Sequence, residues 1–165
     1  MGGGHLVDDV GAPLTIGFNL ENTRAVAWAS TRAAAQVTRI NLGTMEGIRK
    51  VIVEAVTRGD SYTRTAERLR EMFEFSPGRA QRIAVYEIGS AYEEGKRMAA
   101  GEMARQGLRM ERKAQTAGDS RVRPAHRENQ AIGWIGLEDP FPSGDDILPS
   151  DSGCRCTILY RVAKS

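Results

Sequence analysis

Hydrophobic positions recur with helical spacing through the first two thirds of the chain. The clearest stripe lies between Thr44, which can cap a helix, and Gly59, which can end one. Its apolar residues fall at positions i, i+3, i+4, i+7 and i+8, namely Ile48, Val51, Ile52, Ala55 and Val56. This spacing is typical of a helix with one buried face.

Two capping signals predict further helices after Gly59. Ser61 begins a segment whose inward positions are Ala66, Leu69, Met72 and Phe73, with charged residues between them. Ser76-Pro77 combines a cap residue with proline at the first helical position. It predicts a helix that runs to residue 103 or 104, with a kink or break near Gly95 or Gly101, because glycine weakens a helix interior.

The N-terminal segment is less regular. Leu14, Ile16 and Phe18 alternate with polar or small residues, so residues 8–20 are expected to form a short edge strand or an extended arm. Asn22 can cap an alanine-rich helix that runs to about Ile40.

The hydrophobic period changes after Gly107, and three strands are expected. Residues 108–114 predict the first, although their alternation is poor, and residues 132–137 predict the second. Residues 154–162 alternate best and predict the third. The fold class is therefore α+β, with N-terminal helices followed by a small, loop-rich and mostly antiparallel sheet.

Composition adds limits to this architecture. A length of 165 residues fits one domain, which we divide into an arm at 1–20, a helical region at 21–106 and a C-terminal α+β region at 107–165. The net charge of +2 does not by itself indicate a nucleic-acid-binding protein. No stretch approaches the ~20 apolar residues of a membrane span.

Candidate metal ligands gather in the C-terminal third. Cys154 and Cys156 are the two cysteines of the chain, and residues i and i+2 of a strand share one side. A tetrahedral zinc site needs two further ligands, for which His126 and Asp119 are the natural candidates. A turn at Gly153, where φ > 0 is tolerated, would bring the thiolates closer together.

Other interpretations of these residues stay open. The cysteines can be small buried apolar residues, and His126 can hydrogen-bond across the loop to hold Asp119. A disulfide between Cys154 and Cys156 would be strained and ranks last. A nuclease-like or other toxin-type enzyme that uses His126 and Asp119 is the alternative function, but no second acid or base stands in register with His126.

Three arginines surround the candidate histidine. Arg121, Arg123 and Arg127 lie within seven positions of one another around His126. They can form a solvated or ion-paired surface, or they can contact phosphates and bind nucleic acid without sequence preference.

Several motifs together resemble the phage Mu protein F-like minor head proteins, also called phage head morphogenesis proteins. Residues 118–126 read Gly-Asp-Ser-Arg-Val-Arg-Pro-Ala-His, residues 141–145 read Phe-Pro-Ser-Gly-Asp, and residues 154–157 read Cys-Arg-Cys-Thr. Upstream, residues 82–88 are similar to a helix of that family. The resemblance covers about residues 44–162 and depends on the order and spacing of the motifs.

The chain departs from the family pattern in one chemically important place. Some members carry Cys-Pro-x-Cys where this chain has Arg123-Pro124-Ala125-His126. The four-cysteine form resembles a zinc knuckle, so the resemblance implies that His126 takes one ligand place. Arg123 cannot take the other, and Asp119 would have to fill it.

The resemblance implies a non-enzymatic minor capsid protein of a tailed phage or prophage. Its partners would be the portal or other capsid proteins, and double-stranded DNA bound without sequence preference. It would be made in the host cytoplasm and located in the virion, in the capsid interior or at the portal vertex. It would assist head assembly and genome packaging or delivery, with zinc as the expected cofactor.

Overall fold

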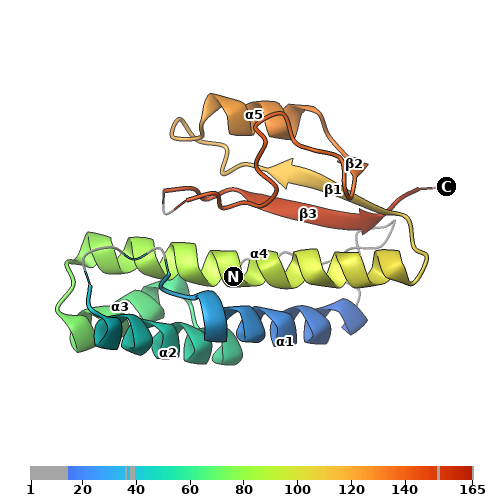
Figure 1. Ribbon diagram of the computed structural model, residues 1–165. Coiled ribbons are helices and arrows are strands. Elements are labelled where there is room, and N and C mark those ends of the chain that lie inside the picture. Colours follow the sequence, from blue (N-terminus) through green and yellow to red (C-terminus); the bar gives the residue numbers. More distant parts are fainter. Residues whose placement is uncertain (1–14, 36, 38–39, 152, 165) are drawn as a thin grey trace.

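Helix α4 (Pro77–Arg105) lies in the middle of the molecule and packs against other elements on two of its faces (Figure 1). The computed structural model describes residues 15–35, 37, 40–151 and 153–164. Helices α1 (Thr15–Arg32), α2 (Leu42–Arg58) and α3 (Tyr62–Phe73) lie on one side of α4, and a small sheet lies on the other (Figure 1). A short helix, α5 (Pro124–Ala131), covers the far face of the sheet. This arrangement confirms the predicted α+β fold, with helices first and a small antiparallel sheet after them.

The helix boundaries follow the capping residues closely. The side chain of Ser61 accepts a hydrogen bond from the amide of Arg64, and the side chain of Ser76 accepts one from Arg79, as the sequence predicts. Helix α2 begins earlier than expected, because Asn41 rather than Thr44 caps it. Gly59 ends α2 with a left-handed φ of 69°.

Helix α1 differs from the sequence prediction at both ends. Residues 15–20 are helical, so the strand or extended arm predicted there is wrong, whereas residues 1–14 lie outside the described part of the chain. Asn22 lies inside the helix rather than at its start. The helix ends at Arg32, and Ala34 takes a positive φ of 67° in the turn that follows. Ala25 and Ala29 of this helix pack into the helical core, and Ala33 and Ala34, directly after its end, are buried in the same core.

The core between α1, α2, α3 and α4 is built from small aliphatic side chains. All five residues of the α2 stripe are buried in it. Leu69 is also fully buried, but Met72, which the helical period places inward, is 56% exposed. Gly47 allows a close approach to Phe73, because a Cβ there would lie 2.7 Å from the ring.

The sheet has the order β2-β1-β3, with both pairs antiparallel. Strand β1 (Met110–Gln115) lies in the middle, between β2 (Ile135–Gly136) and β3 (Thr157–Val162). The strand predicted at 132–137 shrinks to β2, because Ile132 closes helix α5. Helix α5 was missed by the hydrophobic pattern, although Pro124 at its first turn is a start signal.

Helix α4 is continuous from Pro77 to Arg105, so the break predicted near Gly95 or Gly101 does not occur. Its second face is buried against the sheet, where Ala99 and Ala100 join Leu148, Ile158 and other residues of a second core. These contacts on two faces stabilise the helix and offset the weakening effect of its glycines.

A buried polar network ties α4 to the outer edge of β3. Lys96 Nζ donates to Glu93 at 2.6 Å, to Thr157 Oγ1 at 2.9 Å and to the carbonyl of Ile158 at 2.8 Å. Glu93 accepts from the amide of Ile158 at 3.0 Å and from the hydroxyl of Thr157. These contacts satisfy backbone groups of Ile158 on an edge strand, and so fix β3 and the cysteines before it.

Candidate metal centre

Three side chains from distant parts of the chain meet beside the sheet. His126 stands in the first turn of α5, and Cys154 and Cys156 directly precede β3. All three are buried, and their ligand atoms lie within 4.8 Å of one another. His126 Nδ1 is 3.6 Å from Cys154 Sγ and 3.6 Å from Cys156 Sγ. A cluster of this composition could hold a metal ion.

The other nitrogen of His126 is held by a carboxylate. Nε2 donates a hydrogen bond to Asp145 Oδ2 at 3.1 Å. With the proton on Nε2, the lone pair of Nδ1 is directed toward the two sulfurs. Metal-ligating histidines have this arrangement, in which a carboxylate on the far nitrogen fixes the ring and its tautomer.

A chain of side-chain hydrogen bonds holds Asp145 in place. The fully buried Asn129 donates from Nδ2 to Ser143 Oγ at 2.7 Å and accepts from the amide of Ser143 at 3.0 Å. Ser143 Oγ in turn accepts from the amide of Asp145 at 3.1 Å. The loop is therefore attached to α5 at two points, Asn129 and His126, which are both buried residues of that helix.

The cysteines are presented by an aspartate turn. Asp151 Oδ1 accepts from the amide of Gly153 at 2.9 Å, and the carbonyl of Asp151 accepts from the amide of Cys154 at 2.9 Å. Gly153 is not among the described glycines with positive φ, so the turn expected from it comes from Asp151 instead. Asp151 also forms an ion pair with Arg123, which lowers the pKa of the Asp151 carboxyl.

The structure does not bring Asp119 into the cluster. Its carboxylate binds Arg155, whose Nη2 lies 2.8 and 2.7 Å from the two oxygens. This ion pair lowers the pKa of Asp119 and keeps the carboxylate charged. Arg155 stands between the two cysteines in the sequence, and its guanidinium holds the Asp119 carboxylate outside the cluster. The hydrogen-bond partner of His126 is Asp145, not Asp119.

The sulfurs of Cys154 and Cys156 both contact the same nitrogen, Nδ1 of His126. A neutral imidazole with its proton on Nε2 has one lone pair at Nδ1, which accepts from one thiol at a time. Burial and the nearby Cys154 raise the pKa of the Cys156 thiol to about 11, so a cation is needed to hold it as a thiolate near neutral pH. Both cysteines are free.

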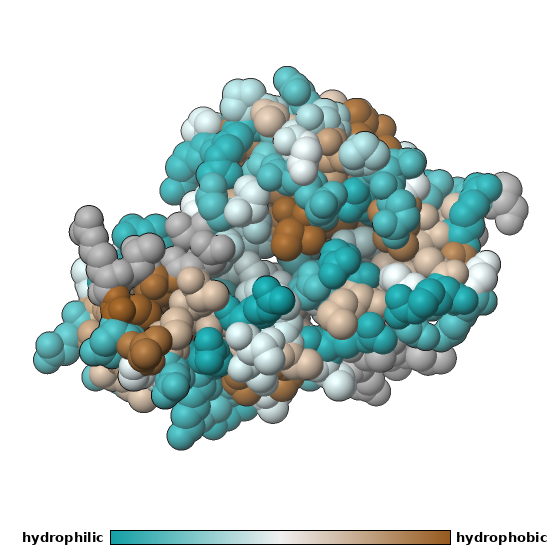
Figure 2. Space-filling model, viewed as in Figure 1, coloured by the Kyte–Doolittle hydropathy of each residue, from teal (hydrophilic) through white to brown (hydrophobic). Residues whose placement is uncertain are grey.

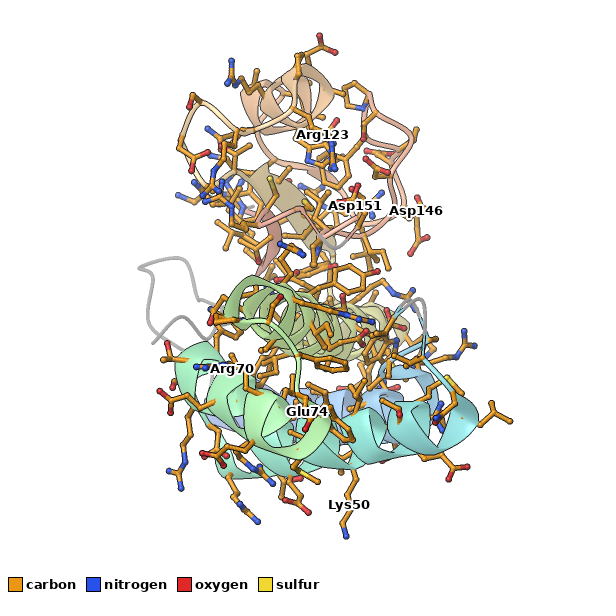
Figure 3. The ribbon with its side chains drawn as sticks, turned by 90° about the vertical axis from the view of Figure 1, so that its left-hand side faces the viewer. Lys50, Arg70, Glu74, Arg123, Asp146 and Asp151 are labelled. Carbon is orange, nitrogen blue, oxygen red and sulfur yellow. The ribbon has the colours of Figure 1, made fainter. Side chains whose placement is uncertain are left out.

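Of the three arginines predicted to contact nucleic acid, Arg121 and Arg123 line the cavity at this cluster and Arg127 does not, and the three differ in exposure and in their partners. Arg121 is 76% exposed, and its nearest carboxylate, that of Asp119, is 3.8 Å away. Arg123 is engaged by Asp151, and both residues lie in the sheet half of the molecule (Figure 3). Arg127 donates to the carbonyls of Asp119 and Ser120 at 3.5 and 3.4 Å.

The sequence prediction missed Asp145 and Asn129. Asp145 ends the Phe-Pro-Ser-Gly-Asp motif at 141–145, so a signal for it was present, but its contact with His126 depends on the tertiary fold. Asn129 lies one helical turn after His126 on the same face of α5, a relation visible only once that helix is known.

Comparison with known proteins identifies the family. Residues 46–159 match the family described as Phage Mu protein F like protein, a span that runs from α2 into β3 and includes the whole cluster. No curated protein and no solved structure matches the chain. None of the helices among the described residues is both long enough and apolar enough to span a membrane. The match covers well over half of the sequence, so the chain belongs to the family of phage Mu protein F like proteins.

Proposed function

We propose that this chain is a non-enzymatic minor capsid protein, associated with the portal, in which a zinc ion held by His126, Cys154 and Cys156 stabilises the C-terminal half. Membership of the phage Mu protein F like family suggests a phage head morphogenesis protein, with capsid proteins as partners and the virion as its location. The family match carries this part of the proposal.

The geometry of the cluster supports the zinc ion. In a tetrahedral site with Zn–N near ~2.05 Å and Zn–S near ~2.3 Å, the nitrogen and each sulfur are about 3.6 Å apart. Both observed Nδ1–Sγ distances are 3.6 Å. Both contacts therefore have the length that two sulfurs and one nitrogen bound to a single zinc ion would give.

Metal analysis tests the zinc site directly. We expect about one zinc per chain, and thiols that react only after a chelator has removed the metal. Cys154→Ser and His126→Ala should lower zinc content and thermal stability together, while His5→Ala, at the other histidine of the chain, should change neither. Metal-free protein with freely reactive thiols would contradict the site.

The same variants separate a structural role from an enzymatic one. If the cluster stabilises a capsid component, His126→Ala should weaken the fold. An enzyme that used this histidine for catalysis should keep its fold and lose only turnover.

An exposed apolar surface supports a role in protein contacts. At the end of the helical bundle, Leu42 is 74% exposed and Met72 is 56% exposed. Met72 lines an open cavity of about 500 Å³ together with Ile40, Phe73 and Phe75, and the polar part of the same lining is formed by Asn41, Thr44, Glu71 and Glu74. Figure 2 shows hydrophobic surface at this end of the bundle. Exposed apolar side chains rimmed by polar residues are typical of sites that bind other proteins.

The proposal includes sequence-independent binding of double-stranded DNA through Arg121, Arg123 and Arg127. Arg121 offers the most exposed guanidinium of the three. Binding measured by fluorescence anisotropy with two unrelated duplexes should be similar for both and should fall with salt. Arg121→Ala should reduce the salt slope by about one. Arg105→Ala, at a side chain 67% exposed on α4, is the matched control.

A further inference from the structure

The three ligand residues line a small cavity. Its volume is about 50 Å³, and His126, Cys154 and Cys156 form one part of its wall. The rest of the wall is formed by the side chains or backbone of Ala117, Arg121, Val122, Arg123, Gly153 and Arg155. None of these described lining residues adds a fourth histidine, cysteine or carboxylate to the set.

A tetrahedral zinc ion with three protein ligands needs a fourth ligand, which can come from the protein or from a small molecule. Structural sites are closed by a fourth protein ligand, whereas open sites keep the fourth position for solvent or another small molecule. Asp119, the sequence candidate for the fourth place, is held by both oxygens on Arg155. Moving it to the cluster would leave that arginine without its partner.

We propose that the fourth coordination position of this metal opens into the cavity, where solvent occupies it and a small anion can replace the solvent. This inference depends on the proposed zinc site and names the ligand class that the site would accept. A cavity needs ~10–15 Å³ to hold one water molecule, so the space admits water or a small linear anion that enters end-on.

The charges around the cavity favour an anion. Two thiolates and a neutral imidazole balance the charge of a divalent cation, so the metal cluster itself would be neutral. Arg123 and Arg155 are balanced by Asp151 and Asp119. Asp145, whose carboxylate contacts His126, is not among the residues that line the cavity. Of the lining arginines, Arg121 has the loosest ion pair, a 3.8 Å contact with Asp119, and is therefore the guanidinium best able to approach an anion there.

Cobalt substitution tests the zinc site and its open fourth position separately. The full chain is loaded with Co²⁺, and its visible spectrum is recorded during titration with sodium thiocyanate, against sodium perchlorate at equal ionic strength. We expect sulfur-to-cobalt charge-transfer bands on loading, and a saturable change of the ligand-field bands with thiocyanate only. Absence of the charge-transfer bands would overturn the zinc site itself. Their presence without any response to thiocyanate would overturn the open position and leave the zinc site standing.

Two variants identify what fills and surrounds the fourth position. Asp119→Asn should keep both the cobalt spectrum and its response, and a changed ligand-field spectrum would instead make Asp119 the fourth ligand. Arg121→Ala should weaken the apparent thiocyanate affinity about twofold to fivefold, the range expected for one exposed charge. Arg105→Ala should leave the affinity unchanged. An equal affinity in the Arg121 variant would overturn the role given to that residue.

Discussion

The two cores on opposite faces of helix α4 are held together by different forces. The core toward α1, α2 and α3 consists of alanine, isoleucine, valine and leucine. The core toward the sheet is smaller and includes Met110, Phe141, Tyr160 and both cysteines. Most of the buried polar side chains are also on that side, namely Ser90, Glu93, Lys96, Arg112, His126 and Asn129.

The difference shows how a loop-rich region can be ordered without a large apolar core. Arg112 on β1 donates to the carbonyls of Asp146 and Asp139 at 3.0 and 2.7 Å, and its guanidinium lies 4.6 Å from the ring centroid of Phe141. These contacts and the Asn129–Ser143 pair fix the long connection between β2 and β3. Buried hydrogen-bonded networks specify one arrangement of a chain, whereas apolar packing alone tolerates several.

The largest effect is expected where the polar network crosses from α4 to the sheet. Lys96→Met leaves the Glu93 carboxylate buried without its cation, which should lower the free energy of unfolding by about 3–5 kcal/mol. Chemical denaturation measures the loss. The double variant Glu93→Leu with Lys96→Met should recover much of it, and a single variant as stable as the parent would show that the network adds nothing.

In the aliphatic core between α4 and the other long helices, the loss of stability on substitution should depend on how deeply the side chain is buried. Leu69 is fully buried, so Leu69→Ala should cost about 3–4 kcal/mol through lost transfer energy and a residual cavity. Leu42→Ala, at a leucine 74% exposed, is the matched control and should change stability by less than about 0.5 kcal/mol. Equal losses for the two variants would mean that the helical core is packed differently.

One buried acid makes the helical side sensitive to pH. Burial raises the pKa of Glu87 from its ordinary 4.5 to about 7, and one of its oxygens has no hydrogen-bond partner among the described residues. Because the folded pKa is raised, the stability due to this group is complete below pH 4.5 and is lost as the pH rises to about 7. The loss should reach at most about 3 kcal/mol.

Replacement of this acid isolates its contribution. Glu87→Gln cannot ionise, so its free energy of unfolding should vary less between pH 4.5 and pH 8 than that of the parent. Glu67→Gln, at an exposed residue of α3, should follow the parent curve. Parallel curves for the parent and Glu87→Gln would show that Glu87 does not titrate in this range.

The smallest effect is expected for Asn129 of α5, which holds the loop that carries Asp145. Asn129→Ala removes two hydrogen bonds to Ser143 and should cost about 1–2 kcal/mol. It should also speed thiol modification, because the contact between Asp145 and His126 loses its support. Asn41→Ala removes a helix cap at a cost of about 1 kcal/mol, and should not change thiol reactivity.

The sequence predicts those features that depend on residues close together along the chain, and fails for those that depend on tertiary packing. The α2 stripe and the caps Ser61 and Ser76 depend on residues a few positions apart, and the structure confirms them. Helix α5 escaped prediction because its eight residues are mostly polar and show no long apolar period. The limits of α1 were wrong because packing against α4 overrides the local preference of Asn22.

The sequence by itself determined that a helical region precedes a small sheet, the α+β class and the residue types that can bind a metal, because all of these follow from local periodicity, spacing and side-chain chemistry. Only the tertiary structure decided which of those residues meet. Arg155 lies beside Asp119 although 36 positions separate them, and His126 is left with the two sulfurs on one side and Asp145 on the other. Such pairings depend on how α5, the loop after β2 and the start of β3 pack together, and no local rule specifies that packing.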